Sequence, residues 1–218
     1  MIRCLICASR KYVILEDHVT AWFDCCLYAR SLLPANPHLY GPKYKQEYLK
    51  RASSKEGKEL LAKRVALVEK EIVPLTSILI DVGSGISIFE KSFTLQKVLS
   101  YEPYLEREHS LASVYKSSRD ESKGLLFFDS FEHIERPCDF LLIFRPVAVL
   151  ITIPILPPSV VSDPSLILRF KHYKPEEHIH YFTSVALRKL FSALSYSYAE
   201  LGPEEGRLAV EHFKFIRG

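Results

Sequence analysis

The 218-residue sequence lacks a strong excess of charge of either sign, because 29 lysines and arginines stand against 26 aspartates and glutamates. A net charge of +3 is too small to indicate a nucleic-acid-binding protein by itself. Since 48% of the residues are hydrophobic, global disorder is excluded as well. The length fits one α/β domain with some additions.

A long uninterrupted apolar run is also missing. The most apolar region, residues 140–161, is broken by Arg145 and by four prolines, which indicates buried strands and loops instead of a membrane span. The first 20 residues carry charges throughout and contain no apolar core before a cleavage site, so no signal peptide is expected. We therefore expect a cytoplasmic protein without a membrane-spanning segment.

The five cysteines do not make an even set, and without an export signal a disulfide framework is not expected. Cys4 and Cys7 form a C-x-x-C pair, which is typical of one half of a zinc ribbon. The second pair, Cys25 and Cys26, is adjacent in sequence, so a four-cysteine site would be awkward unless a neighbouring residue replaced one ligand. The sequence leaves two alternatives, a structural zinc on these four cysteines or cysteines that bind no metal. The residues available as replacement ligands are His18 and Asp24.

The segment Ile78–Glu90 has the pattern of a strand, a tight turn and the start of a helix. Its apolar run ends at Asp81, and Gly83 and Gly85 follow. Glycines permit a sharp turn and the close approach of a flat ligand. A dinucleotide fingerprint needs a third glycine where this chain has Ile88, so a nicotinamide dinucleotide is disfavoured.

The rest of the chain predicts a Rossmann-like doubly wound α/β sheet. Residues 97–102 form the next expected strand, and Glu102 at its end lies 21 residues beyond Asp81, where a carboxylate can bind both hydroxyls of a ribose. Residues 147–154 predict a further buried strand, Thr183 caps an expected helix, and an antiparallel strand pair closes the chain. The usual third strand is hard to find. We expect a small N-terminal extension over residues 1–56 and the main domain over 57–218.

Three motifs, in order, resemble those of one family. Asp81-Val-Gly-Ser-Gly-Ile-Ser87 resembles motif I of the class I S-adenosylmethionine (SAM) dependent methyltransferases, in which a small residue often replaces the third glycine. Asp129-Ser-Phe-Glu-His-Ile134 resembles the motif after the fourth strand of the ubiquinone-biosynthesis-like, small-molecule group of that family. Glu177-His-Ile-His-Tyr-Phe-Thr183 resembles a later signature of the same group.

This resemblance, which covers about residues 75–200, implies SAM as the cofactor. It implies a cofactor site made of Asp81, Gly83, Ser84, Gly85, Glu102, Asp129 and Ser130. It further implies an acceptor site lined by Glu132, His133 and Tyr181. The predicted helix over residues 43–51 resembles one in related enzymes whose aromatic side chain closes over the cofactor, which would be Tyr44 or Tyr48 here. A solvated amphipathic helix fits the same pattern. The candidates for contact with the adenine are Ser117, Ser118 and Asp120.

Histidines are the candidate catalytic residues, because a histidine titrates near neutral pH and can accept a proton from the acceptor. The candidates are His133, His178 and His180. Each would equally serve as a loop histidine bonded to the backbone. His178 and His180 also have the spacing of two metal ligands, but the sequence shows no third ligand near them.

We therefore expect a SAM-dependent methyltransferase acting on a small molecule. The alternative is a SAM-binding domain that has lost methyl transfer and serves as an interaction module. A nucleic-acid acceptor stays open, but no motif for methylating a DNA base is present. Pro137-Cys138 lies too far beyond Asp129 to match the cytosine-methylating nucleophile, and Ile155-Leu-Pro-Pro158 lacks the asparagine and the aromatic of the amino-methylating enzymes.

Overall fold

The computed structural model describes residues 2–34, 36–102 and 110–218, and these form two compact units. The parallel unit contains residues 37–131 and 136–151. The antiparallel unit contains residues 1–36, 132–135 and 152–218. The division predicted at residues 56 and 57 stays a prediction, and it does not coincide with the limits of these units.

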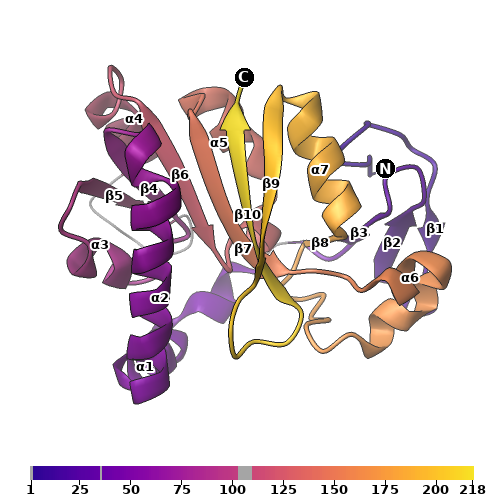
Figure 1. The fold of residues 1–218 in the computed structure, drawn as a ribbon. Helices are drawn as coiled ribbons and strands as arrows, with labels where there is room; N and C mark the ends of the chain where they lie inside the picture. The colour runs from indigo at the N-terminus through magenta and orange to yellow at the C-terminus, as the bar shows by residue number, and fades with distance from the viewer. Residues whose placement is uncertain (1, 35, 103–109) are drawn as a thin grey trace. The chain divides into compact units, whose positions relative to one another are not determined.

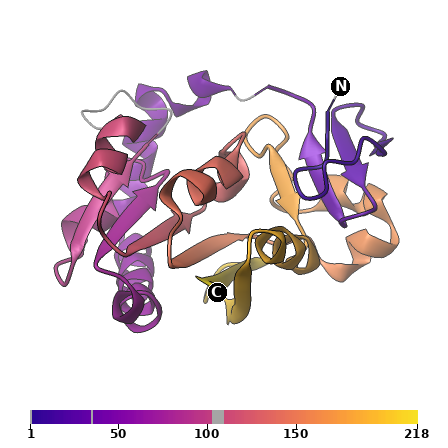
Figure 2. The ribbon, with the colours of Figure 1, turned by 90° about the horizontal axis from the view of Figure 1, so that it is seen from above.

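From Ile78 onward the parallel unit alternates strands and helices (Figure 1 and Figure 2). Strand β4 (Ile78–Val82) pairs in parallel with both β5 (Lys97–Tyr101) and β6 (Lys123–Phe128). The unit also contains η1 (Pro37–Tyr40), α1 (Pro42–Ser53), α2 (Lys55–Glu71), η2 (Val73–Leu75), α3 (Ile88–Ser92), α4 (Leu111–Ser117) and α5 (Pro137–Phe144). From their sequence, residues 105–115 are also expected to form a helix, and this segment falls partly outside the described residues.

Alternation along β6 places α2 and α5 on opposite faces of the sheet. Successive side chains of a strand point to opposite faces. Phe127 makes an edge contact with Phe140 of α5, whereas the next residue, Phe128, lies under the guanidinium of Arg64 from α2. Strand β4 between these layers is buried at every position, as its unbroken apolar run predicts.

The antiparallel unit contains a four-stranded sheet in the order β1-β2-β3-β8. Its strands are β1 (Val13–Ile14), β2 (Thr20–Phe23), β3 (Tyr28–Ser31) and β8 (His180–Phe182). A buried cluster around Trp22 and Tyr181 packs this sheet against α6 (Pro158–Ser162) and η4 (Pro164–Arg169). The unit also holds α7 (Ser184–Ala193), capped by the Thr183 side chain as predicted, and the antiparallel pair β9 (Tyr196–Pro203) and β10 (Val210–Arg217).

Strand β7 (Ala148–Pro154) belongs to a six-stranded sheet in the order β5-β4-β6-β7-β10-β9. The mixed α/β fold predicted from the sequence, with its antiparallel closing pair, is confirmed. Beyond β5 the described residues add no further strand to this sheet, in agreement with the missing third strand of the sequence. Among the residues that the structure describes, no helix is long and apolar enough to cross a bilayer.

Candidate functional site

The glycine turn after β4 is built on left-handed backbone conformations. Gly83 has a φ of +76° and Gly85 a φ of +55°. A Cβ atom on Gly83 would lie 2.3 Å from the Cβ of Ser130, so a larger residue cannot be placed there without moving the chain. The Ser130 hydroxyl donates to the carbonyl oxygen of Val82 at 2.6 Å, which ties the end of β6 to the end of β4.

Predicted cofactor residues from three strand ends meet at this turn. Asp81 is buried near the end of β4. Glu102, directly after β5, accepts a hydrogen bond from the Gly85 backbone N–H at 2.9 Å. The backbone N–H of Gly83 donates to the Tyr101 carbonyl oxygen at 2.8 Å, which holds the turn against β5. The carboxyl ends of parallel strands share one edge of a sheet, and ligands of open α/β sheets bind at that edge.

Asp129 has a partner that the sequence analysis did not include in the site. Its Oδ2 atom lies 2.6 Å from Nη2 of Arg64, whose side chain is mostly buried on α2. The same guanidinium stacks on Phe128, with its central carbon 4.9 Å from the ring centroid. Arg64 has no role in the site predicted from the sequence, because a helical pattern does not show that a strand end lies beside the charged face of the helix.

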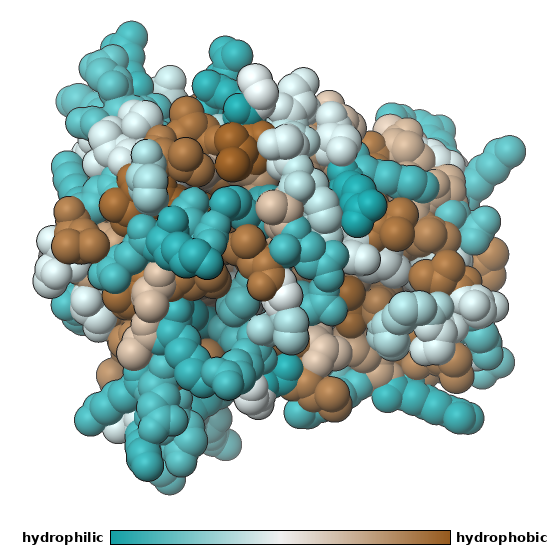
Figure 3. Space-filling view, in the orientation of Figure 1, coloured by the Kyte–Doolittle hydropathy of each residue, from teal (hydrophilic) through white to brown (hydrophobic). Residues whose placement is uncertain are grey.

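Tyr48 of α1 covers the glycine turn. A Cβ atom built on Gly85 would lie 3.4 Å from the Tyr48 ring, and Tyr44 stacks on Tyr48 with ring centroids 6.3 Å apart. Burial, followed by the nearby Asp81 charge, raises the pKa of Tyr48 to about 12, so the phenol stays neutral at physiological pH. Most other side chains of α1 are hydrophilic, apart from the exposed Leu49 (Figure 3). The helix thus has features of both alternatives considered from the sequence, a tyrosine beside the glycine turn and a solvated face.

The residues suggested for adenine contact lie at the other edge of the sheet. Ser118 is buried, and its hydroxyl donates to the carbonyl oxygen of Val114 at 2.9 Å. The chain after it leads into the start of β6, where Lys123 pairs with Ile78 at the start of β4. The glycine turn follows the opposite end of β4, so this suggestion does not agree with the topology.

A second group of polar side chains lies in the antiparallel unit. Glu132, His133 and His178 each direct one ligand atom to a common place, with these atoms all within 4.8 Å of one another. The His133 Nε2 atom is 3.8 Å from Glu132 Oε1, and the two imidazole rings meet edge to face with centroids 4.6 Å apart. Glu132 is only 2% exposed.

A hydrogen bond to the backbone holds the His133 ring in place. Its Nδ1–H donates to the carbonyl oxygen of Glu177 at 2.9 Å, so in the neutral ring the lone pair is on Nε2. Metal-bound histidines have this arrangement, with the second ring nitrogen bonded to a backbone carbonyl. The backbone N–H of Ile179 donates to the Glu132 carbonyl at 2.9 Å and joins the two segments that supply the ligands.

His180 and Tyr181 lie apart from this group. His180 is 1% exposed, its Nδ1 bonds the Tyr28 hydroxyl, and its Nε2 donates to the Ile134 carbonyl at 2.9 Å. Burial lowers the pKa of His180 to about 3, which keeps the ring neutral. Tyr181 packs in the core cluster around Trp22, and its hydroxyl accepts the Lys174 backbone N–H at 3.1 Å. These contacts favour a structural position for both residues over contact with an acceptor.

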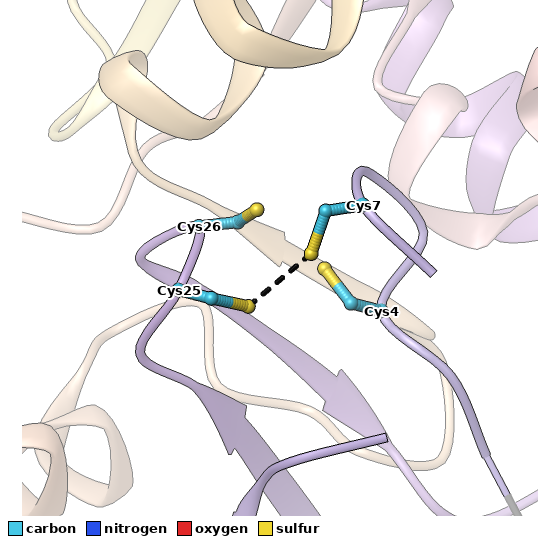
Figure 4. Close-up of side chains that lie close together, drawn as sticks. All are labelled: Cys4, Cys7, Cys25 and Cys26. Carbon is cyan, nitrogen blue, oxygen red and sulfur yellow. Dashed lines mark hydrogen bonds between the residues drawn. The ribbon is translucent and has the colours of Figure 1, made fainter. Parts of the chain in front are cut away.

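The four N-terminal cysteines also come together (Figure 4). All four sulfur atoms lie within 4.8 Å of one another, which includes the adjacent pair that looked awkward in the sequence. Neither His18 nor Asp24 belongs to this cluster. A hydrogen bond from the Ser9 backbone lowers the pKa of the Cys7 thiol to about 7.

Comparisons with known proteins identify the fold. No family model matches the sequence, and no curated protein matches it. The magnesium protoporphyrin IX methyltransferase of Synechocystis PCC 6803, solved with S-adenosylhomocysteine, is similar with a TM-score of 0.54 and 9% identity, over 84% of this chain and 98% of that one. A protein of Nostoc punctiforme PCC 73102, assigned as an O-methyltransferase, is similar with a TM-score of 0.50 and 11% identity, over 86% of this chain and 63% of that one.

This chain has the class I SAM-dependent methyltransferase fold. At these identities the similarity concerns the fold, and the activity has to be argued from this chain's own residues. Ligands of open α/β sheets bind outside the carboxyl ends of the strands, and in this chain that edge is made by the turn after β4 and the ends of β5 and β6. Asp81, Gly83, Glu102 and Ser130 stand at that edge.

Proposed function

We propose that this protein is a SAM-dependent methyltransferase. The observation that carries the proposal is the glycine turn, in which the backbone conformation and the space at Gly83 exclude a side chain while Asp81 and Glu102 flank it. Because glycines form a sharp turn at the carboxyl ends of the strands and carboxylates stand beside it, its residues fit an adenosine carrying an amino acid.

SAM supplies a methyl group attached to a positively charged sulfur. The chain's contribution is to bind and orient, since in-line transfer requires alignment and exclusion of water more than covalent help. The two oxygens of Glu102 provide acceptors for ribose hydroxyls, in exchange for the present bond to Gly85 N–H. Asp81 supplies a buried negative charge near the turn, and the Tyr48 ring covers it.

For the acceptor we propose a small molecule with an oxygen nucleophile, bound through the cluster of Glu132, His133 and His178. Two histidines and one carboxylate are the ligand set of open divalent-cation sites. Ligand atoms about 2.1 Å from one metal stand roughly 3 to 4 Å apart, and the 3.8 Å between His133 Nε2 and Glu132 Oε1 fits that range. A divalent cation there would act as a Lewis acid that lowers the pKa of an acceptor hydroxyl.

The proposed function is tested by methyl transfer from SAM labelled in its methyl group. Purified protein is incubated with pools of small hydroxylated and carboxylated molecules, with manganese or magnesium added or with a chelator. We expect label in the small-molecule fraction that depends on the cation. SAM binding without transfer to any pool would favour the alternative, a binding domain that has lost its activity.

Replacing Tyr48 tests the cover over the turn. Tyr48→Ala is expected to weaken SAM binding by about 5- to 30-fold, because a desolvated aromatic contact with a cation contributes up to about 2 kcal/mol. Tyr48→Phe keeps the ring and should stay within about twofold, because only the ring is required. Calorimetric titration with SAM measures both, and Tyr115→Ala, which removes a tyrosine elsewhere in the same unit, is the control. Equal affinity of Tyr48→Ala and the wild type would show that Tyr48 has no part in the site.

A further inference from the structure

The four N-terminal cysteines have the spacing of a metal site. A tetrahedral zinc with Zn–S bonds of about 2.3 Å places its sulfur atoms roughly 3.8 Å apart. Here the Cys7 and Cys25 sulfurs are 3.3 Å apart, and all four sulfurs lie within 4.8 Å of one another. Figure 4 shows the four side chains pointing toward one shared place from two separate loops. The distances between the four sulfurs are thus close to those of a tetrahedral site.

Both loops are tight turns that aim two sulfurs inward. In the first, the Ala8 N–H donates to the Cys4 carbonyl at 3.0 Å and the Cys4 N–H donates to the Ser9 carbonyl at 2.8 Å. In the second, between β2 and β3, the Cys26 N–H donates to the Phe23 carbonyl at 3.2 Å. The residue after each cysteine pair, Ala8 or Leu27, has a left-handed φ of +58° or +55°.

Such conformations are unfavourable in a residue other than glycine, so the surrounding structure must hold them. The second turn is held by α7 and its cap. The Thr183 hydroxyl donates to the Leu27 carbonyl at 2.9 Å, and the Lys189 ammonium donates to the Cys25 carbonyl at 3.2 Å. The first turn has weaker support, since the following strand β1 consists of two exposed residues. A bond from both turns to one ion would fasten the first to the second.

We propose that Cys4, Cys7, Cys25 and Cys26 bind one structural zinc ion. The ion fastens residues 4–9 to the β2–β3 turn and so completes the N-terminal edge of the antiparallel unit. Four thiolates around Zn²⁺ carry a net negative charge, and the Lys189 ammonium at the second turn offsets part of it. The zinc site requires neither SAM nor an acceptor, so its test is independent of the proposed function.

A disulfide is the competing use of these residues. A bond between Cys7 and Cys25 would employ the two exposed cysteines and leave the buried Cys4 and Cys26 directed at it without a role. Convergence of all four sulfurs therefore favours a metal over a disulfide. Two turns that each present both of their sulfurs are also what a tetrahedral site requires.

The test replaces the metal with cobalt. The full chain is purified without chelator, its zinc content is measured, and Co²⁺ is exchanged for the native ion. We expect one zinc per chain at this site and the intense visible and near-ultraviolet absorption of tetrahedral cobalt bound to thiolates. Absorption from thiolates separates this site from the Glu132 cluster, which has no sulfur ligand.

Single substitutions locate the site. Cys7→Ser and Cys25→Ser alter exposed residues and are expected to weaken metal binding by at least about 100-fold, since even loss of an outer contact costs 10- to 100-fold. Cys138→Ala, which removes the fifth cysteine from α5, should leave the cobalt spectrum unchanged. If a variant fails to fold, the cobalt spectrum and the zinc content of the wild type still test whether thiolates bind the metal. Wild-type protein without zinc and with a Cys7–Cys25 disulfide by mass spectrometry would overturn the proposal.

Discussion

Gly83→Ala is expected to weaken SAM binding by at least about 100-fold. The new methyl group would lie 2.3 Å from the Ser130 Cβ, closer than carbon atoms approach, and the backbone at a φ of +76° is unfavourable for alanine. The backbone conformation costs about 1 to 2 kcal/mol and overpacking about 1 to 3 kcal/mol. The turn therefore has to move, and it moves at the place where we propose the cofactor lies.

Gly206→Ala is the matched control for this experiment. Gly206 has a φ of +83°, close to that of Gly83, but a Cβ there would meet no atom within 4 Å. The control thus shares the backbone cost and lacks both the clash and the proximity to the turn. We expect Gly206→Ala to lose about 1 to 2 kcal/mol of stability and to keep its SAM affinity. Thermal unfolding and calorimetric titration of both variants measure the two effects separately.

Two outcomes would count against the account of the turn. SAM affinity of Gly83→Ala within about threefold of the wild type would show that the cofactor does not depend on this turn. Equal loss of affinity in both variants would trace the effect to general destabilisation. If Gly83→Ala does not fold, Glu102→Gln changes the same site without adding an atom.

Glu132→Gln is expected to lower turnover by at least about 100-fold and to leave SAM affinity within about twofold. The amide keeps the shape of the side chain and removes its negative charge, which is the anionic ligand of the cluster with His133 and His178. Loss of one ligand from a three-ligand site weakens the metal strongly, because outer contacts alone are worth 10- to 100-fold. Since Glu132 is not a residue of the glycine turn, cofactor binding should persist.

The control is a second buried carboxylate in the same unit. Glu204 is 2% exposed, as Glu132 is, and its Oε2 pairs with Arg207 Nη1 at 2.6 Å, outside the cluster. Glu204→Gln should cost stability without changing the dependence of turnover on the divalent cation. His178→Ala, compared with His172→Ala at a half-buried histidine outside the cluster, repeats the test at another ligand.

Titration with manganese distinguishes a metal site from a general base. If the cluster binds a cation, a chelator abolishes wild-type turnover, added manganese restores it, and Glu132→Gln needs a much higher concentration. If His133 or His178 acts as a base, turnover follows pH and is insensitive to the chelator. The second result would remove the metal from the proposal and leave methyl transfer in place.

The sheet was predictable from sequence because its signals are local. Neighbouring residues are enough to predict each element. Examples are the apolar run into Asp81, the glycines after it and the β-branched run of β7. The Thr183 cap and the helix after it followed from the same kind of pattern and are confirmed. The position of Glu102 beside the glycine turn then followed from the rules of doubly wound sheets.

The polar clusters were less predictable because they join distant segments. His178 was considered as a metal ligand with His180, its neighbour in sequence, but the structure assembles it with Glu132 and His133, about 45 residues earlier. His180 is the first residue of β8 and bonds Tyr28 in the core, whereas His178 lies before the strand begins. The partnership of Arg64 with Asp129 likewise depends on how α2 crosses the sheet. No local pattern encodes either of these contacts.

The central claim, that the glycine turn binds SAM, is tested most directly by calorimetric titration with S-adenosylhomocysteine, its demethylated form. The wild type is compared with Glu102→Gln and with Glu59→Gln, which changes an acid on the exposed face of α2. We predict that the wild type binds one ligand per chain and that Glu59→Gln binds it equally well. Glu102→Gln is expected to bind about 10- to 100-fold more weakly, because charge-assisted hydrogen bonds contribute about 1.5 to 3 kcal/mol. Absence of any heat with folded wild-type protein, or equal affinity in all three proteins, would contradict the account.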